Sequence, residues 1–344
     1  MIVMDSNSGK ERFFRALRGE ELDRTPVFPL LMHLAANRAG ITYREFARNG
    51  RSLAEAQLAM LDRYPLDAIT ACSDAFRVSA DLGGEMVYPE NSPPHLARPL
   101  VVTEQDISAL KRPDADRGRM RDRSDAIRIM AESAGDRAAV LGWVDMPYAE
   151  ASSVTGVADF MMMAVTDPDS AHRLLRFLTD IVIDFALAQV EAGADMIGAG
   201  DAATSLVSPA MYREFALPYE QQVIEAVHAA GKTVKLHICG NTENHLPFLP
   251  ESGADLFNVD HMVSFTHARD TYTGVGKSFK GNLDPVEDML NSTPEACEAK
   301  AHELIRLAST PYYMLSAGCE IPSAIDDAVF SAFCHAPQTY LKPS

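Results

Sequence analysis

The stretch Lys235-Leu236-His237-Ile238-Cys239-Gly240-Asn241 joins an apolar run to an abruptly polar end, and this layout points to the fold of the chain. The residues before Gly240 predict a β-strand, in which side chains two residues apart leave on the same face. His237 and Cys239 are therefore expected side by side at the end of this strand. An imidazole and a thiol at this spacing can bind one metal ion.

A second stretch, Ser316-Ala317-Gly318-Cys319-Glu320-Ile321-Pro322, also predicts an apolar strand that ends in a turn containing glycine. Cys319 adds a second thiol, so that His237, Cys239 and Cys319 offer one nitrogen and two sulfurs. These are three of the four ligands of a tetrahedral Zn²⁺ site, and a catalytic zinc keeps its fourth position open. We expect substrate, water, Glu320 or Asp201 in that position.

Short apolar runs alternate with long helical patterns along the chain, which is typical of βα units on a parallel sheet. Helices are expected over residues 9–18, 170–192, 208–230, 294–307 and 323–334. Eight apolar runs predict strands at 27–32, 68–72, 139–144, 196–199, 233–238, 256–259, 278–281 and 312–316. The pattern predicts an α/β fold, a (β/α)8 TIM barrel that forms a single domain over residues 1–344.

The connection between the second and third predicted strands, residues 73–137, is too long for a simple βα loop. It contains Gly83-Gly84, Pro93-Pro94 and an Arg/Asp-rich run over 112–128. We expect an insertion that folds over the mouth of the barrel as a lid or docking element, with a β-hairpin near 78–102.

The composition argues against several classes of partner. Lys plus Arg number 31 against 48 for Asp plus Glu, and the formal net charge of −17 repels a nucleic-acid backbone. No apolar run approaches the roughly 20 residues of a membrane span. The N-terminus lacks a basic and then apolar leader, so we expect a cytoplasmic protein. The five cysteines are odd in number and widely spaced, which favours reduced thiols and a metal over a disulfide framework.

Carboxylates recur where the predicted strands end, and in a barrel of this kind those ends form the active site. Asp201, Asp260 and Glu320 are candidate catalytic residues, because a carboxylate can take the proton that a thiol releases when it binds a metal. The aspartates also have a structural interpretation, since Asp at such turns commonly caps a helix or binds loop amides.

Other polar residues at the strand ends are candidate contacts for a cofactor or substrate: His33, Asp145, Asn241 and Asn282. Cys72 also follows a predicted strand, but we interpret it as a small core residue and leave it out of the ligand set.

With these residues in hand, the chain resembles the uroporphyrinogen decarboxylase superfamily over nearly its full length. Residues 12–20, Arg-Phe-Phe-Arg-Ala-Leu-Arg-Gly-Glu, followed by Asp23-Arg24-Thr25-Pro26-Val27, are similar to the superfamily's opening segment. Gly281-Asn282-Leu283-Asp284-Pro285 is similar to its signature at the seventh strand. The resemblance implies a (β/α)8 barrel, in agreement with the strand pattern.

The chain departs from the decarboxylase itself at two places. The decarboxylase has an arginine pair after the first strand to hold substrate carboxylates, where this chain offers residues 30–38 with only Arg38. It also has a histidine after the eighth strand, where this chain has Cys319.

His237-x-Cys239 with the distant Cys319 is similar to the zinc motif of the superfamily's cobalamin-dependent methyltransferases. That resemblance implies a zinc enzyme that moves a methyl group between methylcobalamin and a small thiol, methoxy or methylamine-type molecule. It also implies a separate corrinoid protein as partner. Two alternatives stay open. One is a decarboxylase of an acidic tetrapyrrole, which needs cationic side chains in its cavity. The other is a non-catalytic corrinoid-binding barrel.

Overall fold

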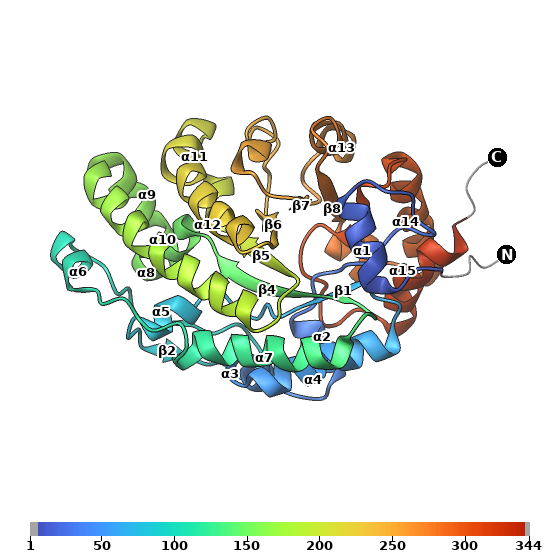
Figure 1. Cartoon of the computed structure of the whole chain (residues 1–344), viewed down its shortest axis with the longest axis horizontal. Coiled ribbons are helices and arrows are strands. Elements are labelled where there is room, and N and C mark those ends of the chain that lie inside the picture. The colour runs from blue at the N-terminus through green and yellow to red at the C-terminus, as the bar shows by residue number, and fades with distance from the viewer. Residues whose placement is uncertain (1–5, 341–344) are drawn as a thin grey trace.

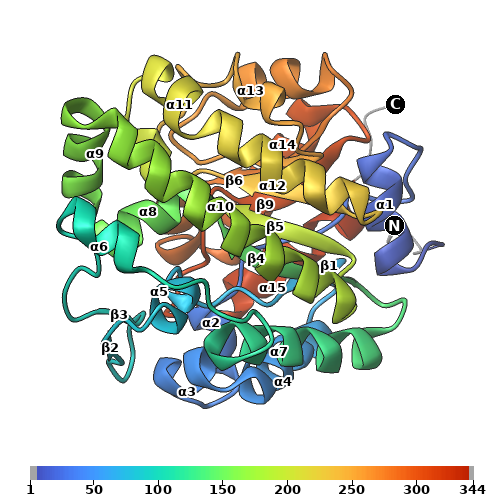
Figure 2. The same cartoon turned by 60° about the vertical axis from the view of Figure 1, so that its left-hand side comes forward.

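The computed structural model describes residues 6–340, and its centre is a curved sheet of seven parallel strands (Figures 1 and 2). The strands follow one another around the sheet in the order β1-β4-β5-β6-β7-β8-β9. They are β1 (Ala68–Thr70), β4 (Ala139–Asp145), β5 (Met196–Gly200), β6 (Thr233–His237), β7 (Leu256–Asn258), β8 (Ser278–Leu283) and β9 (Tyr313–Ala317). The predicted barrel architecture is confirmed. The N-terminal stretch in which we expect no leader includes residues 1–5, which lie outside the described residues.

The first predicted strand, 27–32, is wrong as a continuous strand. The segment makes two isolated parallel bridges, Val27 with Leu315 and Leu30 with Glu320. On its other side the amide of Asp67, just before β1, donates to the carbonyl of Val27 at 2.9 Å. Pro29 interrupts the segment, because proline has no amide hydrogen to give to a sheet. Residues 26–32 therefore close the ring between β9 and β1 without regular pairing.

A buried ion-pair cluster fixes this segment at the N-terminal end of the barrel. Asp67 pairs with Arg12 at 2.5 Å and with Arg24 at 2.7 Å. It also accepts the amide of Val27 at 2.7 Å. The cluster joins the opening segment to β1, at the end of the barrel opposite to the strand ends that carry the polar residues.

Helices cover the outside of the sheet in both views (Figures 1 and 2). The helices α1 (Gly9–Leu17), α10 (Pro168–Glu191) and α14 (Pro294–Ala308) lie close to the predicted bounds, and α15 (Asp327–Thr339) begins later than expected. None of the helices within residues 6–340 has the length and apolar character to cross a membrane. The other helices outside the 73–137 connection are α2 (His33–Arg38), α3 (Tyr43–Arg48), α4 (Gly50–Arg63), α8 (Pro147–Thr155), α9 (Val157–Thr166) and α13 (Phe265–Thr273), with the short turns η1 (Ala202–Leu206), η2 (Leu249–Ser252) and η3 (Pro285–Leu290).

The predicted helix at 208–230 is divided into two. The first part is α11 (Pro209–Phe215) and the second is α12 (Leu217–Ala229), with a break at Ala216, where φ is −117° and ψ is −61°. Pro218 explains the break, because proline cannot donate to the carbonyl four residues earlier and its ring clashes with that carbonyl.

The long connection between β1 and β4 contains both peripheral and barrel elements. Its first part holds α5 (Arg77–Asp81), α6 (Glu104–Ala109) and a small hairpin in which β2 (Met86–Val87) pairs antiparallel with β3 (His95–Leu96). The hairpin lies within the predicted range. The last part, α7 (Gly118–Ala134), packs against α4 and β4 and belongs to the helical layer (Figure 2). The role of residues 73–137 as a lid stays a prediction.

Candidate functional site

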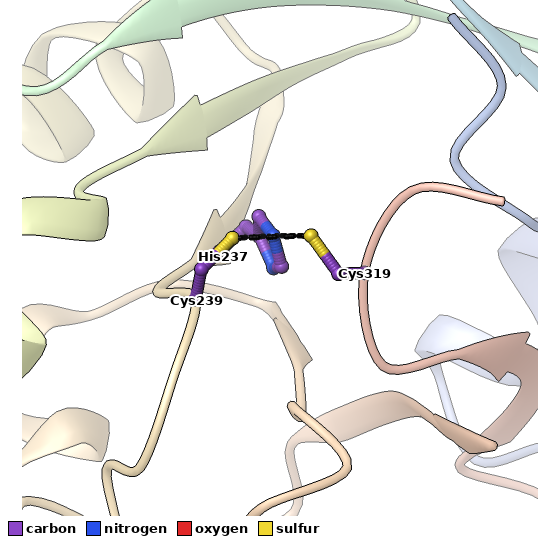
Figure 3. A group of neighbouring side chains, drawn as sticks. All are labelled: His237, Cys239 and Cys319. Carbon is purple, nitrogen blue, oxygen red and sulfur yellow. Dashed lines mark hydrogen bonds between the residues drawn. The ribbon is translucent and has the colours of Figure 1, made fainter. Parts of the chain in front are cut away.

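The three predicted metal ligands meet at the C-terminal end of the barrel. Cys239 and Cys319 point their sulfurs toward each other from two separate loops, with the imidazole of His237 beside them (Figure 3). The Nε2 atom of His237 lies 2.8 Å from the sulfur of Cys239 and 3.7 Å from that of Cys319, and the two sulfurs are 3.3 Å apart. Among residues 6–340 this is the one group of three or more His, Cys, Asp or Glu side chains that converges closely enough to hold a metal ion.

The spacing of these atoms fits zinc. Ideal tetrahedral zinc places its nitrogen and sulfur ligands about 3.6 Å apart and two sulfurs about 3.8 Å apart. The triangle of 2.8, 3.3 and 3.7 Å is therefore slightly smaller than one face of that tetrahedron. The sulfurs are too far apart for a disulfide, whose bond is about 2.05 Å long. Both thiols are free and only partly exposed.

Each thiol changes the proton affinity of the other. The pKa of Cys319 is lowered, first by the hydrogen bond from Cys239 and then by His237. The pKa of Cys239 is raised by its hydrogen bond with Cys319 and then by burial. One thiolate is thus already favoured by the protein, and thiolates are the form that binds metal.

A glycine lies next to each cysteine of the site. Gly240 directly follows Cys239 and has φ of +93°, a conformation in which a side chain would be strained. A Cβ atom on Gly318 would lie 2.4 Å from the amide nitrogen of His261. The turn before Cys319 is therefore packed against the loop that follows β7.

A cavity of about 690 Å³ opens over the three donors. Leu30, Met32, Cys72 and Trp143 form an apolar wall, and the thiol of Cys72 lies 3.2 Å from the sulfur of Met32. Residues from β3 and the chain after it, 95–99, form another side. A cavity of this size and apolar character suits a small molecule with few polar groups.

Two predicted residues with carboxyl groups line this cavity. Asp145 ends β4, and Glu320 follows Cys319 and accepts the amide of His33 at 2.6 Å. Burial raises the pKa of Asp145 to about 7, against the opposing charge of Arg123. Burial likewise raises the pKa of Glu320 to about 7, and the bond from His33 works in the opposite direction. Each carboxyl can therefore exchange a proton near neutral pH.

His33 lies beside the cavity and does not line it. It begins α2, and its ring is 4.9 Å from that of Tyr43. Burial lowers the pKa of His33. Its contact with the site is the backbone bond to Glu320.

The structure places Asp201 away from the cavity. It follows Gly200, whose backbone pairs with His237, so its side chain leaves on the other face of β5. Asp201 is fully buried, and its pKa is raised by burial and then by Glu220 of α12. Tyr212 donates to the same glutamate at 2.7 Å.

Asp260, Asn282 and Asn241 hold loops and do not line the cavity. Asp260 accepts the amides of Gly240 at 2.9 Å and Met262 at 3.0 Å. Asn282 donates to the carbonyls of Asp260 and Val263. Asn241 is exposed and accepts the amide of Glu243. Asp260 therefore has the structural role of binding loop amides, and it supports the turn after Cys239.

Sequence reasoning missed Trp143 and Lys235. The indole of Trp143 lies across β5, where Gly198 and Gly200 leave room, since Cβ atoms there would lie 2.7 and 3.0 Å from its ring. The ammonium of Lys235 lies 4.6 Å from the centre of a Trp143 ring. Burial lowers the pKa of Lys235 to about 8, while Cys72, Cys239 and Cys319 raise it. The alternation along β6 was a usable signal, because it places Lys235 on the face of His237.

Comparisons with known proteins show what the chain is similar to. The family model described as uroporphyrinogen decarboxylase (URO-D) matches residues 8–340. The chain is 29% identical to a methylcobamide:CoM methyltransferase MtbA of Methanosarcina mazei, covering 98% of this chain and 99% of that protein. It is 30% identical to a uroporphyrinogen decarboxylase of Xanthomonas axonopodis pv. citri, covering 84% and 85%. A solved methyltransferase from Methanosarcina mazei superposes with a TM-score of 0.87 at 24% identity, covering 96% and 98%.

Proposed function

Because the chain belongs to the uroporphyrinogen decarboxylase family, we propose which reaction of that family it carries out. We infer that it is a zinc-dependent methyltransferase that moves a methyl group between a corrinoid and a small thiol, methoxy or methylamine-type compound. The observation that carries this proposal is the convergence of His237, Cys239 and Cys319 beneath the cavity. Its nearly full-length similarity to methylcobamide:CoM methyltransferases supports the same conclusion.

The three donors would hold zinc and leave one position facing the cavity. Bound zinc supplies Lewis acidity, which lowers the pKa of a coordinated thiol or alcohol and stabilises the same group when it leaves. The apolar wall of Leu30, Met32, Cys72 and Trp143 excludes water from this position and accommodates a methyl group. Asp145 and Glu320 are the lining carboxyls that can take up the proton released by the small molecule.

The corrinoid would approach from the open side of the cavity. A cavity of about 690 Å³ is of the size that holds one small ligand, so the corrinoid is presented at its mouth. We propose that a separate corrinoid protein carries it and that residues 73–137 form the lid or docking element. Residues 95–99 of this segment line the cavity, which supports that role. Free thiols at the site suit a reducing compartment, and we propose the cytoplasm.

A decarboxylase of an acidic tetrapyrrole is the second candidate, since relatives with that name are about as similar in sequence. Such a substrate carries several carboxylates and needs several cations to hold it. Among the described residues that line the cavity, Arg98 is the one Lys or Arg. Arg38 instead pairs with Asp327 of α15 at 2.7 Å. The cavity therefore favours methyl transfer.

The first test measures metal and activity together. Purified protein should contain close to one zinc per chain, and less than about 0.3 counts against the proposal. Cys239→Ala and Cys319→Ala should lose zinc and methyl transfer together. Cys72→Ala is the matched control, because this cysteine lines the same cavity outside the donor group and should leave zinc content unchanged.

The second test separates the three functions. Methylcobalamin is incubated with the protein and a panel of thiols, amines and phenols, and demethylated cobalamin is followed by absorbance. Turnover beyond one equivalent supports the methyltransferase. Stoichiometric binding without demethylation indicates a non-catalytic barrel, and carbon dioxide release from a carboxylated tetrapyrrole indicates the decarboxylase.

A further inference from the structure

Lys235 is a buried cation without an ordinary partner. It is 1% exposed, and no carboxylate or hydrogen-bond acceptor among residues 6–340 binds its ammonium group. Burying an unpaired charge is costly, and proteins normally place a counter-charge beside it. The position of Lys235 therefore calls for a compensating group that the protein atoms alone do not supply.

The surroundings of Lys235 direct its charge toward the metal centre. Lys235 and His237 alternate along β6 and leave on the same face, and Cys239 follows two residues after the strand ends. The acidic groups that act on Lys235 are the thiols of Cys72, Cys239 and Cys319. The ring of Trp143 lies 4.6 Å from the ammonium and offers it a cation–π contact. The charge thus lies against Trp143, a residue of the wall that borders the three donors.

The charge of the complete centre explains what the lysine compensates. Zinc carries two positive charges, and the thiolates of Cys239 and Cys319 cancel them when His237 binds as a neutral imidazole. A neutral fourth ligand leaves the centre uncharged, whereas a thiolate gives it one negative charge. We propose that Lys235 is a positioning residue whose charge makes the fourth position prefer an anionic ligand over a neutral one.

This inference rests on the proposed function and narrows its substrate class. It favours a molecule that binds as an anion, such as a thiolate, over an amine or an ether oxygen. The thiol gives up its proton on binding, to a lining carboxyl such as Asp145 or Glu320, and the positive charge of Lys235 then offsets the negative charge left on sulfur.

Lys280 provides a matched control in the same barrel. It is also fully buried, and its ammonium lies 3.8 Å from the centre of the Phe28 ring. Unlike Lys235, it donates a hydrogen bond to the carbonyl of Phe28 at 2.6 Å. Lys280→Met therefore removes a second buried amine, one that already has a protein acceptor.

The experiment uses the full chain loaded with Co²⁺ in place of zinc, so that ligands at the fourth position are seen by visible absorbance. Azide is an anionic probe, 2-mercaptoethanol is a thiol that would bind as its thiolate, and imidazole is the neutral probe. Lys235→Met should weaken both anionic probes roughly tenfold or more and change imidazole affinity less than about twofold. Lys235→Arg should retain most of the preference for anionic over neutral ligands, and Lys280→Met should retain all of it.

Equal changes for anionic and neutral probes, or no change, would overturn the role of Lys235. If Lys235→Met does not fold, Lys235→Gln takes its place. If neither variant folds, an imidazole affinity of the unmodified protein that equals or exceeds its azide affinity overturns the inference, and the reverse order supports it. Failure of the unmodified protein to bind Co²⁺ instead refutes the metal centre itself, so the two proposals fail separately.

Discussion

The backbone amide of Gly240 donates to a carboxylate oxygen of Asp260 at 2.9 Å, so that a side chain from the end of one strand holds the turn after the cysteine of its neighbour. The other oxygen of Asp260 accepts the amide of Met262 at 3.0 Å. The turn that carries Cys239 and the loop after β7 are thereby joined. Asp260 touches no substrate space, and its effect passes through the position of the cysteine.

We predict that Asp260→Asn lowers zinc affinity by about ten- to a hundredfold, the usual effect of losing a group that orients a metal ligand. Asparagine keeps the shape of the side chain but has only one carbonyl oxygen. One of the two backbone amides, of Gly240 or Met262, therefore loses its acceptor. Competition with a chromophoric chelator measures the change. Asp284→Asn is the control, because Asp284 caps the loop after β8 in a similar way and should leave the affinity unchanged. Equal affinities for Asp260→Asn and the unmodified protein would refute the role.

Zinc should stabilise the folded chain measurably. A ligand that binds only the folded state adds about 2.7 kcal/mol when its free concentration is 100 times Kd. We expect removal of zinc by a chelator to lower Tm, and readdition to restore it. The same chelator should leave the Tm of Cys319→Ala unchanged, since this variant has already lost a ligand. A Tm independent of zinc would contradict tight binding to the folded state.

Gly198→Ala should displace Trp143. The new methyl carbon would lie 2.7 Å from the indole, and such overpacking typically costs about 1–3 kcal/mol. Trp143 is the one tryptophan of the chain, so its fluorescence reports on this position without interference. We expect shifted emission and a lower free energy of unfolding in urea. Unchanged emission would show that the ring does not depend on this gap.

Asp145→Asn should change how stability depends on pH. Burial raises the pKa of Asp145 to about 7, so between about pH 4 and pH 7 the folded state binds more protons than the unfolded state. This residue therefore contributes a stability that falls as pH rises through that range. The variant lacks this pH dependence. Its free energy of unfolding, relative to that of the unmodified protein, should therefore rise by roughly 1–3 kcal/mol between pH 5 and pH 8. Urea unfolding of both proteins at pH 5 and at pH 8 measures this difference in stability. The same difference at the two pH values would contradict the prediction.

Much of the site could be predicted because strand periodicity carries the information. His237 ends β6 and Cys239 lies two residues later, while Cys319 follows another strand whose end faces the same mouth. The same periodicity separates Asp145 from Asp201, but only when the register between strands is known. Asp145 pairs with Gly200, and Gly200 pairs with His237, so Asp145 faces the cavity and Asp201, one residue past Gly200, does not.

Features that depend on other parts of the chain escaped prediction. Trp143 reaches its place because two glycines on the next strand leave space, a relation between distant residues that local pattern does not contain. The strand expected at 27–32 was apolar enough, but Pro29 prevents regular pairing. The division of the predicted helix at Ala216 also has a proline as its cause. Pro218 was a local signal of this break, but the continuous amphipathic pattern over 208–230 favoured a single helix.

The irregular closure of the barrel affects both the release of the metal and the hydrogen exchange of nearby backbone amides. The ring closes through Leu30, which bridges to Glu320 and whose carbonyl accepts the amide of Ile321 at 3.1 Å. Cys319 precedes this pair, and the other two donors, at the end of β6 and just after it, lie 80 and 82 residues earlier in the chain. Zinc would tie the loop after β9, which borders this irregular closure, to the end of β6 across the mouth of the barrel. Opening of this closure would displace Cys319 and so release the metal, and metal loss would speed hydrogen exchange at Ile321 before the rest of the barrel responds.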